Sequence, residues 1–168
     1  MKRKNLYQAD VVVENSLDDY LRKCFLNHLV VYNYSLDILI KNPSIKFKDL
    51  KAKCYEFIEE KGIKEFMGSP LFNELYYQYK KFTEKNIRSA KTLTGIHYIT
   101  FLVNGYDNKC FTKDGNKIII HGVDGCIELN EDLPEIPDDK QMMYFNLSYS
   151  NQESKYQLSV FQWQKKKT

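Results

Sequence analysis

The chain has 168 residues and a mass of 20.0 kDa, which fits one domain or a domain with an inserted lobe. Hydrophobic residues make up 43% of it, and 24 aromatic residues (13 Tyr, 10 Phe and 1 Trp) can fill a core, so general disorder is excluded. The longest apolar run, residues 29–32, is far too short for a membrane span, and polar residues interrupt residues 5–10, where a signal peptide would need an apolar stretch. We therefore expect a cytoplasmic protein.

The first half of the chain predicts one strand and a long helix. Residues 6–14 include three consecutive valines at 11–13 and have no helix start signal, which indicates a strand. Apolar residues then recur at helical spacing over residues 16–41. Ser16 is expected to cap the start of this helix, and Pro43 follows its end.

Two shorter helices are expected next. Residues 46–61 place apolar side chains on one helical face, and Gly62 follows where a left-handed C-terminal residue would stand. The third helix is expected to begin at Ser69, because proline is favoured at the first helical position that follows a capping serine. Its predicted buried stripe is Leu71, Leu75, Tyr79, Phe82 and Asn86.

After residue 88 the period of the pattern changes from 3.6 to 2, which indicates strands. The expected strands are residues 96–101, 117–121, 126–129, 141–149 and 155–163, with turns at 104–105, 114–116 and 150–154 and a proline-containing loop at 130–139. A first strand separated from its sheet by helices predicts an α+β fold. This fold would be a small antiparallel β-barrel, residues 1–15 and 92–168, with a three-helix insertion after the first strand, residues 16–91.

Charge is unevenly distributed, although the formal net charge is only +3. Residues 78–117 contain eight bases and three acids (net +5), whereas residues 118–141 contain seven acids and one base (net −6). Such segregation indicates that one face of the protein binds a polyanion. The alternative is that both charged segments are ordinary solvated surfaces.

Nothing in the sequence predicts catalysis, a metal or a cofactor. The four cysteines (Cys24, Cys54, Cys110 and Cys126) form no C-x-x-C pair and are expected as small buried hydrophobes. His28 is expected to be packed or at the rim of a core, and His97 and His121 to be structural. Asp124 is expected in a turn, without the converging carboxylates that two-metal phosphodiester cleavage needs. Nucleophile-elbow and phosphate-loop motifs do not occur, so we predict a protein that is not an enzyme.

The basic residues that follow the third helix predict a nucleic-acid interface. Lysines attract the phosphate backbone, and exposed tyrosines stack on unpaired bases. The candidate binding residues are Tyr76, Tyr77, Lys80, Lys81, Lys85, Arg88, Lys91, Lys109, Lys113 and Lys117. The alternative is that these lysines only keep the protein soluble and that the tyrosines pack in the core. Because the chain has only three arginines, recognition of structured RNA by shape and backbone is favoured over reading of guanine edges.

The order of these elements, together with particular residues, resembles the N-terminal half of TnpB, the RNA-guided nuclease of insertion sequences, and of the miniature type V CRISPR effectors. The matching segments are the initial strand, residues 31–36 (Val-Tyr-Asn-Tyr-Ser-Leu), Phe111, residues 115–118, Ile120, residues 127–129, residues 146–148 and residues 156–161.

The resemblance implies an OB-like wedge barrel interrupted by a helical recognition lobe, which together bind structured guide or scaffold RNA and flanking double-stranded DNA. Full-length members continue into a RuvC nuclease with three carboxylates and a four-cysteine zinc element, and this chain contains neither. The resemblance therefore implies a binding module without the nuclease.

Two other functions stay open. The scarcity of arginine and alanine beside abundant lysine, asparagine, isoleucine and tyrosine is typical of AT-rich coding, as in a phage or a transposon. In that setting the chain would be an anti-CRISPR or regulatory protein that inhibits an RNA-guided nuclease by contacting its polypeptide or its guide RNA, with acidic residues 124–139 facing a basic channel. The second possibility is a subunit or fragment of a split RNA-guided nuclease.

Overall fold

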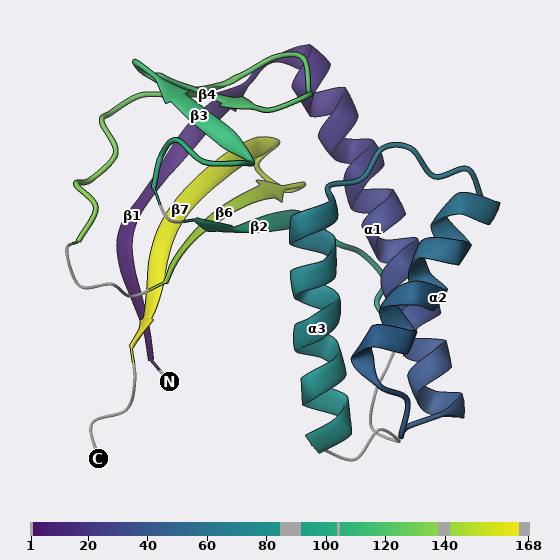
Figure 1. Ribbon diagram of the computed structural model, residues 1–168. Helices are drawn as coiled ribbons and strands as arrows, with labels where there is room; N and C mark the ends of the chain where they lie inside the picture. The colour runs from purple at the N-terminus through teal and green to yellow at the C-terminus, as the bar shows by residue number, and fades with distance from the viewer. Residues whose placement is uncertain (1, 85–91, 104, 138–141, 165–168) are drawn as a thin grey trace. The chain divides into compact units, whose positions relative to one another are not determined.

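The computed structural model describes residues 2–84, 92–103, 105–137 and 142–164 of the chain (Figure 1). The chain forms two compact units. The first consists of Met1–Tyr20 and His97–Thr168, and the second of Leu21–Ile96. Among the described residues, no helix is long and apolar enough to cross a membrane.

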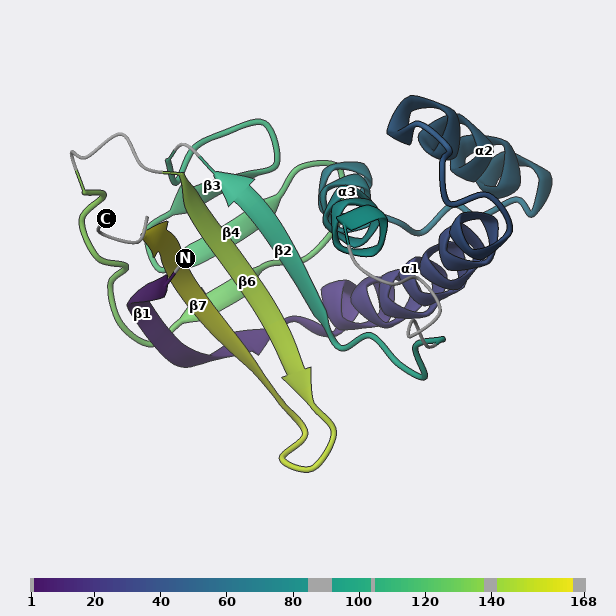
Figure 2. The ribbon, with the colours of Figure 1, turned by 90° about the horizontal axis from the view of Figure 1, so that it is seen from below.

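The first unit contains a seven-stranded antiparallel sheet. Its strands are β1 (Lys2–Val13), β2 (Tyr98–Val103), β3 (Phe111–Asp114), β4 (Lys117–Ile120), β5 (Ile127–Leu129), β6 (Met143–Ser150) and β7 (Lys155–Gln164). Their spatial order is β2-β6-β7-β1-β5-β4-β3, so the first strand of the chain lies in the middle of the sheet (Figure 2). The predicted α+β fold is confirmed, and so is the prediction that the first strand joins the sheet of the C-terminal strands.

Strand β1 has two partners because it lies between β7 and β5. It pairs with β7 from Lys2 opposite Gln164 to Val11 opposite Tyr156, and its last residues pair with β5. The register shifts between Asn5 and Tyr7, and irregularities of this kind increase the local twist of a strand. The loop after β5 and the extended strand β1 were expected from the sequence, but this central position was not.

The sheet curls around an apolar interior. Phe101 on β2, Phe111 on β3 and Phe145 on β6 are all buried, and their ring centroids lie 4.7–6.2 Å apart. Strands β2 and β3 are the two edges of the sheet, yet the rings of Phe101 and Phe111 are in contact at 6.0 Å. The sheet therefore has the form of a half-barrel whose two edges meet through side chains.

The turn before β5 packs closely against the start of α1 (Asn15–Lys41). Gly125 has φ +91°, and a Cβ atom there would lie 2.6 Å from Ser16 Oγ and 3.0 Å from Leu17 N. The α1 helix begins one residue earlier than predicted, because the Asp18 N–H donates to the carbonyl of Glu14. The prediction that Ser16 is the N-cap is therefore wrong, since Glu14 precedes the helix and Ser16 lies in its first turn.

The second unit contains most of α1 together with α2 (Phe47–Glu60) and α3 (Gly68–Glu84). Stacking of Tyr34 on Phe57, with centroids 4.0 Å apart, joins α1 to α2, and stacking of Tyr55 on Phe72 joins α2 to α3. Gly62 follows α2 with φ +63°, as predicted. The predicted start of α3 at Ser69 is corrected to Gly68, because the Leu71 N–H donates to the carbonyl of Met67.

The segment that leaves the helical unit is tied back to α1. The Asn33 side chain donates to the carbonyl of Leu93 and accepts from the Leu93 N–H, both at 3.0 Å. Asn33 belongs to the Val-Tyr-Asn segment that prompted the family resemblance. Its structural role here is to fix residues 92–96 beside the middle of α1.

Candidate nucleic-acid interface

The solvent-facing side of α3 brings four of the predicted binding residues together. Tyr76 and Lys80 are one turn apart, and so are Tyr77 and Lys81, so the two pairs form adjacent rows on one side of the helix. The side chain of Tyr76 is 47% exposed and that of Tyr77 is 66% exposed, and both lysines are exposed. Neither tyrosine belongs to the core, contrary to the alternative assignment of the tyrosines.

The structure also shows how this face is supported. Tyr76 meets the edge of Phe47, with centroids 4.9 Å apart, and the Lys80 ammonium lies 5.8 Å from the centre of the Tyr76 ring. Phe47 also contacts Tyr79, which is half-buried on the predicted stripe. We define Tyr76, Tyr77, Lys80 and Lys81 as the α3 face. The acidic Glu84 is exposed one turn beyond Lys80.

Three predicted binding residues, Lys85, Arg88 and Lys91, lie outside the described residues, as does Asn86 of the predicted stripe. In the sequence they follow α3 directly, so they add three positive charges to the chain immediately after the α3 face. Their contribution stays a prediction.

The remaining three predicted residues belong to the sheet unit, and the strand register does not place them on one face. Lys113 on β3 is opposite the buried Ile118, whereas Lys117 on β4 is opposite Asp114 and also opposite Glu128 on β5. Lys117 therefore lies between two acidic cross-strand neighbours, and their negative charges repel an approaching phosphate. Lys109 is exposed in the loop before β3, where its carbonyl lies 3.0 Å from His121 Nδ1.

His28 positions the start of α3. It is on α1 with 5% of its surface exposed, and its Nε2 accepts a hydrogen bond from the Met67 N–H at 3.1 Å. Because Met67 precedes the first residue of α3, this bond fixes the point at which that helix begins. Burial lowers the pKa of the His28 imidazole to about 4, so it is neutral at pH 7 with its proton on Nδ1.

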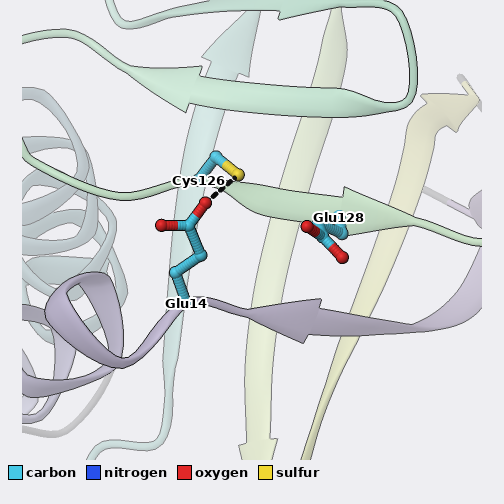
Figure 3. A group of neighbouring side chains, drawn as sticks. All are labelled: Glu14, Cys126 and Glu128. Carbon is cyan, nitrogen blue, oxygen red and sulfur yellow. Dashed lines mark hydrogen bonds between the residues drawn. The ribbon is translucent and has the colours of Figure 1, made fainter.

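Glu14, Cys126 and Glu128 form a group of potential metal ligands (Figure 3). One ligand atom from each lies within 4.8 Å of the others, but the Cys126 thiol already donates to Glu14 Oε1 at 2.7 Å. Burial, followed by the hydrogen bond to Glu14, raises the pKa of this thiol to about 11. Because the thiol proton is engaged by Glu14 and Lys117 stands opposite Glu128, we interpret the group as a hydrogen-bonded link between the residue after β1 and the residue before β5.

The other residues singled out in the sequence have structural surroundings. Cys24, Cys54 and Cys126 are buried and form no disulfide, as predicted, but Cys110 is partly exposed. The His97 carbonyl accepts from the Tyr149 N–H, and His121 Nε2 lies 2.7 Å from Thr112 Oγ1. Asp124 is exposed, outside any helix or strand.

Sequence reasoning missed a second exposed surface, on the outer side of the sheet. The Arg3 guanidinium lies 3.8 Å from the centre of the Phe161 ring, Tyr144 stacks on Phe161 at 5.2 Å, and Trp163 meets it edge-on at 5.8 Å. We call Arg3, Tyr144, Phe161 and Trp163 the aromatic platform. The signal was the alternation of Phe161 and Trp163, but Leu158 and Val160 alternate on the other face, so the sequence alone did not indicate which face is outside.

Fold and site together define an α+β protein with a half-barrel sheet, a three-helix unit and two exposed surfaces that combine aromatic and basic residues. No protein-family model matches the chain, and comparison with curated proteins gives no significant match. The residues and their geometry are therefore the basis of the functional assignment.

Proposed function

We propose that the protein is a non-catalytic nucleic-acid-binding module that holds structured RNA of the guide or scaffold type. The observation that supports this proposal is the α3 face, on which two exposed tyrosines are each followed one turn later by an exposed lysine. Flanking double-stranded DNA is the second ligand that the family resemblance implies.

The chemistry of the α3 face suits an RNA backbone. Each lysine supplies a compact positive charge that replaces the counterions condensed on phosphates, and release of those counterions favours binding. A tyrosine ring one turn away offers a flat surface for a base or a sugar next to the contacted phosphate. Lysine does not make the bidentate contacts that distinguish guanine, so this surface recognises the path of the backbone more than its sequence.

The position of the helical unit in the chain supports an OB-like wedge assignment. Strand β1 enters the centre of the sheet, the chain then leaves for three helices, and it returns at β2 to complete the same sheet. This is the connectivity expected of a wedge barrel with an inserted recognition lobe. On this proposal the sheet is the scaffold, and the inserted helices present the α3 face.

The test is the salt dependence of RNA binding. A double variant, Lys80→Gln with Lys81→Gln, should bind a structured RNA more weakly than the wild type, and the slope of log K against log salt should shrink by about 1.4 to 1.8 for two lost phosphate contacts. The matched control is Lys48→Gln with Lys53→Gln, which removes the same charge from exposed positions of α2. All four lysines are exposed, so neither variant should change the melting temperature appreciably.

Equal slopes for the wild type and the Lys80/Lys81 variant would contradict binding through the α3 face. Equal losses in both variants would indicate a non-specific charge effect and would also contradict the proposal. Stoichiometric binding of an RNA-guided nuclease polypeptide in the absence of RNA would favour the inhibitor function instead.

A further inference from the structure

The geometry of the aromatic platform points to a second contact with RNA, which rests on the proposed function. We propose that Trp163 and its neighbours stack on unpaired bases, so that the sheet unit binds a single-stranded segment of the RNA. The occupant is thus an unpaired stretch of polyribonucleotide and not a duplex, because paired bases present no free ring face.

The rings of the platform are held in place by the strand register. Tyr144 on β6 is directly opposite Phe161 on β7, and Arg3 on β1 is directly opposite Trp163. Phe161 is buried beneath its neighbours, whereas 40% of the Trp163 surface is exposed. The Phe161 and Trp163 rings are nearly perpendicular, at 87°. A large ring that is both exposed and braced can accept a base without first losing conformational freedom.

Arg3 adds a positioned positive charge. Its Nε donates to Asn5 Oδ1 at 2.9 Å, and its terminal nitrogen donates to Ser159 Oγ at 3.2 Å, while the guanidinium lies over Phe161. These contacts hold the guanidinium plane beside the exposed tryptophan. An arginine in this setting supplies both a charge for a phosphate and a flat surface for a base.

The charge around the platform is complementary to a polyanion. Residues 2–4 are all basic, and Lys165, Lys166 and Lys167 follow Gln164, the residue paired with Lys2. Neither residues 2–9 nor residues 156–168 include an acid. Farther along the same face of β1, the carboxylate of Asp10 is already engaged by Lys155 at 3.1 Å. On the platform face of β1 the described positive charge is that of Arg3, whereas Lys4 is opposite the buried Gln162 on the other face. The nearest acid on β1 is paired, and the three lysines that follow Gln164 in the sequence add positive charge to this end of the chain.

Neutral polar side chains continue this face away from the platform. The Gln8 side chain donates to Gln157 Oε1 at 2.9 Å, and the Asn146 side chain donates to Thr100 Oγ1 at 2.7 Å. Such amides can hydrogen-bond to the edges of unpaired bases while adding no negative charge. The outer face thus combines ring surface, positive charge and amides, which are the elements of a single-strand-binding surface.

Trp163 is the single tryptophan of the chain, so its fluorescence reports on the platform alone. The experiment titrates the full-length protein with a labelled oligouridylate of about 15 nucleotides, which stays unpaired, and records oligonucleotide anisotropy and tryptophan emission together. We expect emission to be quenched in parallel with binding. Trp163→Ala should weaken binding about tenfold, and Trp163→Phe should retain most of it.

Two further variants guard against misfolding and unspecific effects. Arg3→Gln removes the positioned charge but no ring, and it should weaken binding and reduce the salt slope. Tyr55→Ala removes a partly exposed ring from α2, together with its stacking on Phe72 in the helical unit, and should leave oligouridylate binding by the sheet unit unchanged. Thermal melting of each variant identifies any loss of binding that follows from unfolding.

The outcomes separate this inference from the proposed function. If oligouridylate binds while tryptophan emission and the affinity of Trp163→Ala stay unchanged, the platform does not stack on bases, yet structured RNA can still depend on Lys80 and Lys81. If tryptophan emission is quenched as the protein concentration rises in the absence of RNA, the platform contacts a second copy of the chain, and the inference is overturned. Failure to bind either unpaired or structured RNA would overturn both.

Discussion

Acid should destabilise the helical unit through His28. The imidazole is buried, and its Nε2 accepts the Met67 N–H that fixes the start of α3. Protonation would place a charge in an apolar site and would remove the acceptor from this hydrogen bond. Burial accordingly lowers the pKa of His28 to about 4, whereas an unfolded histidine has a pKa near 6.5.

The size and sign of the effect follow from this difference in pKa. Above about pH 6.5 the imidazole is neutral in both states and makes no pH-dependent contribution to stability. As the pH falls below 6.5, the unfolded chain binds a proton that the folded chain does not, so the free energy of unfolding decreases until the folded pKa near 4 is reached. The loss from His28 is about 2 kcal/mol at pH 5 and about 3 kcal/mol over the whole interval.

Urea denaturation of the wild type and of His28→Gln at about pH 7.5 and about pH 5 measures this loss. Glutamine keeps an acceptor for the Met67 N–H but does not titrate. Glu74, whose carboxyl pKa is raised by burial, is present in both proteins, so its contribution cancels in the comparison. His97→Gln, which removes an exposed imidazole, is the control. If wild type and His28→Gln lose the same stability between the two pH values, the account of His28 is wrong.

Two further predictions concern the turn before β5 and the thiol that follows it. Gly125→Ala should lower the free energy of unfolding by about 2 kcal/mol or more, because φ is +91° and the new methyl group would meet the first turn of α1. The control Gly115→Ala, at φ +61° in open space, should lower it by about 1 kcal/mol, and chemical denaturation measures both values. Burial and the hydrogen bond to Glu14 raise the pKa of the Cys126 thiol to about 11, so Cys126 should react with iodoacetamide at pH 8 far more slowly than the partly exposed Cys110. Mass spectrometry of the modified peptides measures both rates, and equal rates would contradict the hydrogen-bonded link.

Local patterns in the sequence were sufficient for most elements. Helical spacing of apolar residues predicted all three helices, and Gly62 marked the end of α2 as expected. The starts of α1 and α3 were misassigned by one residue because Ser16 and Ser69 have the side chains of capping residues, whereas the backbone uses the carbonyls of Glu14 and Met67. Capping propensity is a preference that local packing can override.

The parts that could not be predicted depend on contacts between distant residues. The opposition of Arg3 and Trp163 requires the β1–β7 register, which joins the two ends of the chain. Similarly, the sequence named Lys113 and Lys117 as candidate binding residues, but their positions relative to the acids depend on strand pairing, which places Lys113 opposite the buried Ile118 and Lys117 opposite Asp114 and Glu128. The α3 face was predicted because its four residues lie within two turns of one helix.

The most direct measurement of the central claim is to identify what co-purifies with the full-length protein from its native cells after ultraviolet crosslinking. The account predicts RNA of discrete sequence and structure, one molecule per protein, crosslinked to peptides that contain Tyr76, Tyr77 or Trp163. A stoichiometric nuclease polypeptide without RNA, or a tightly bound small molecule in its place, would contradict it.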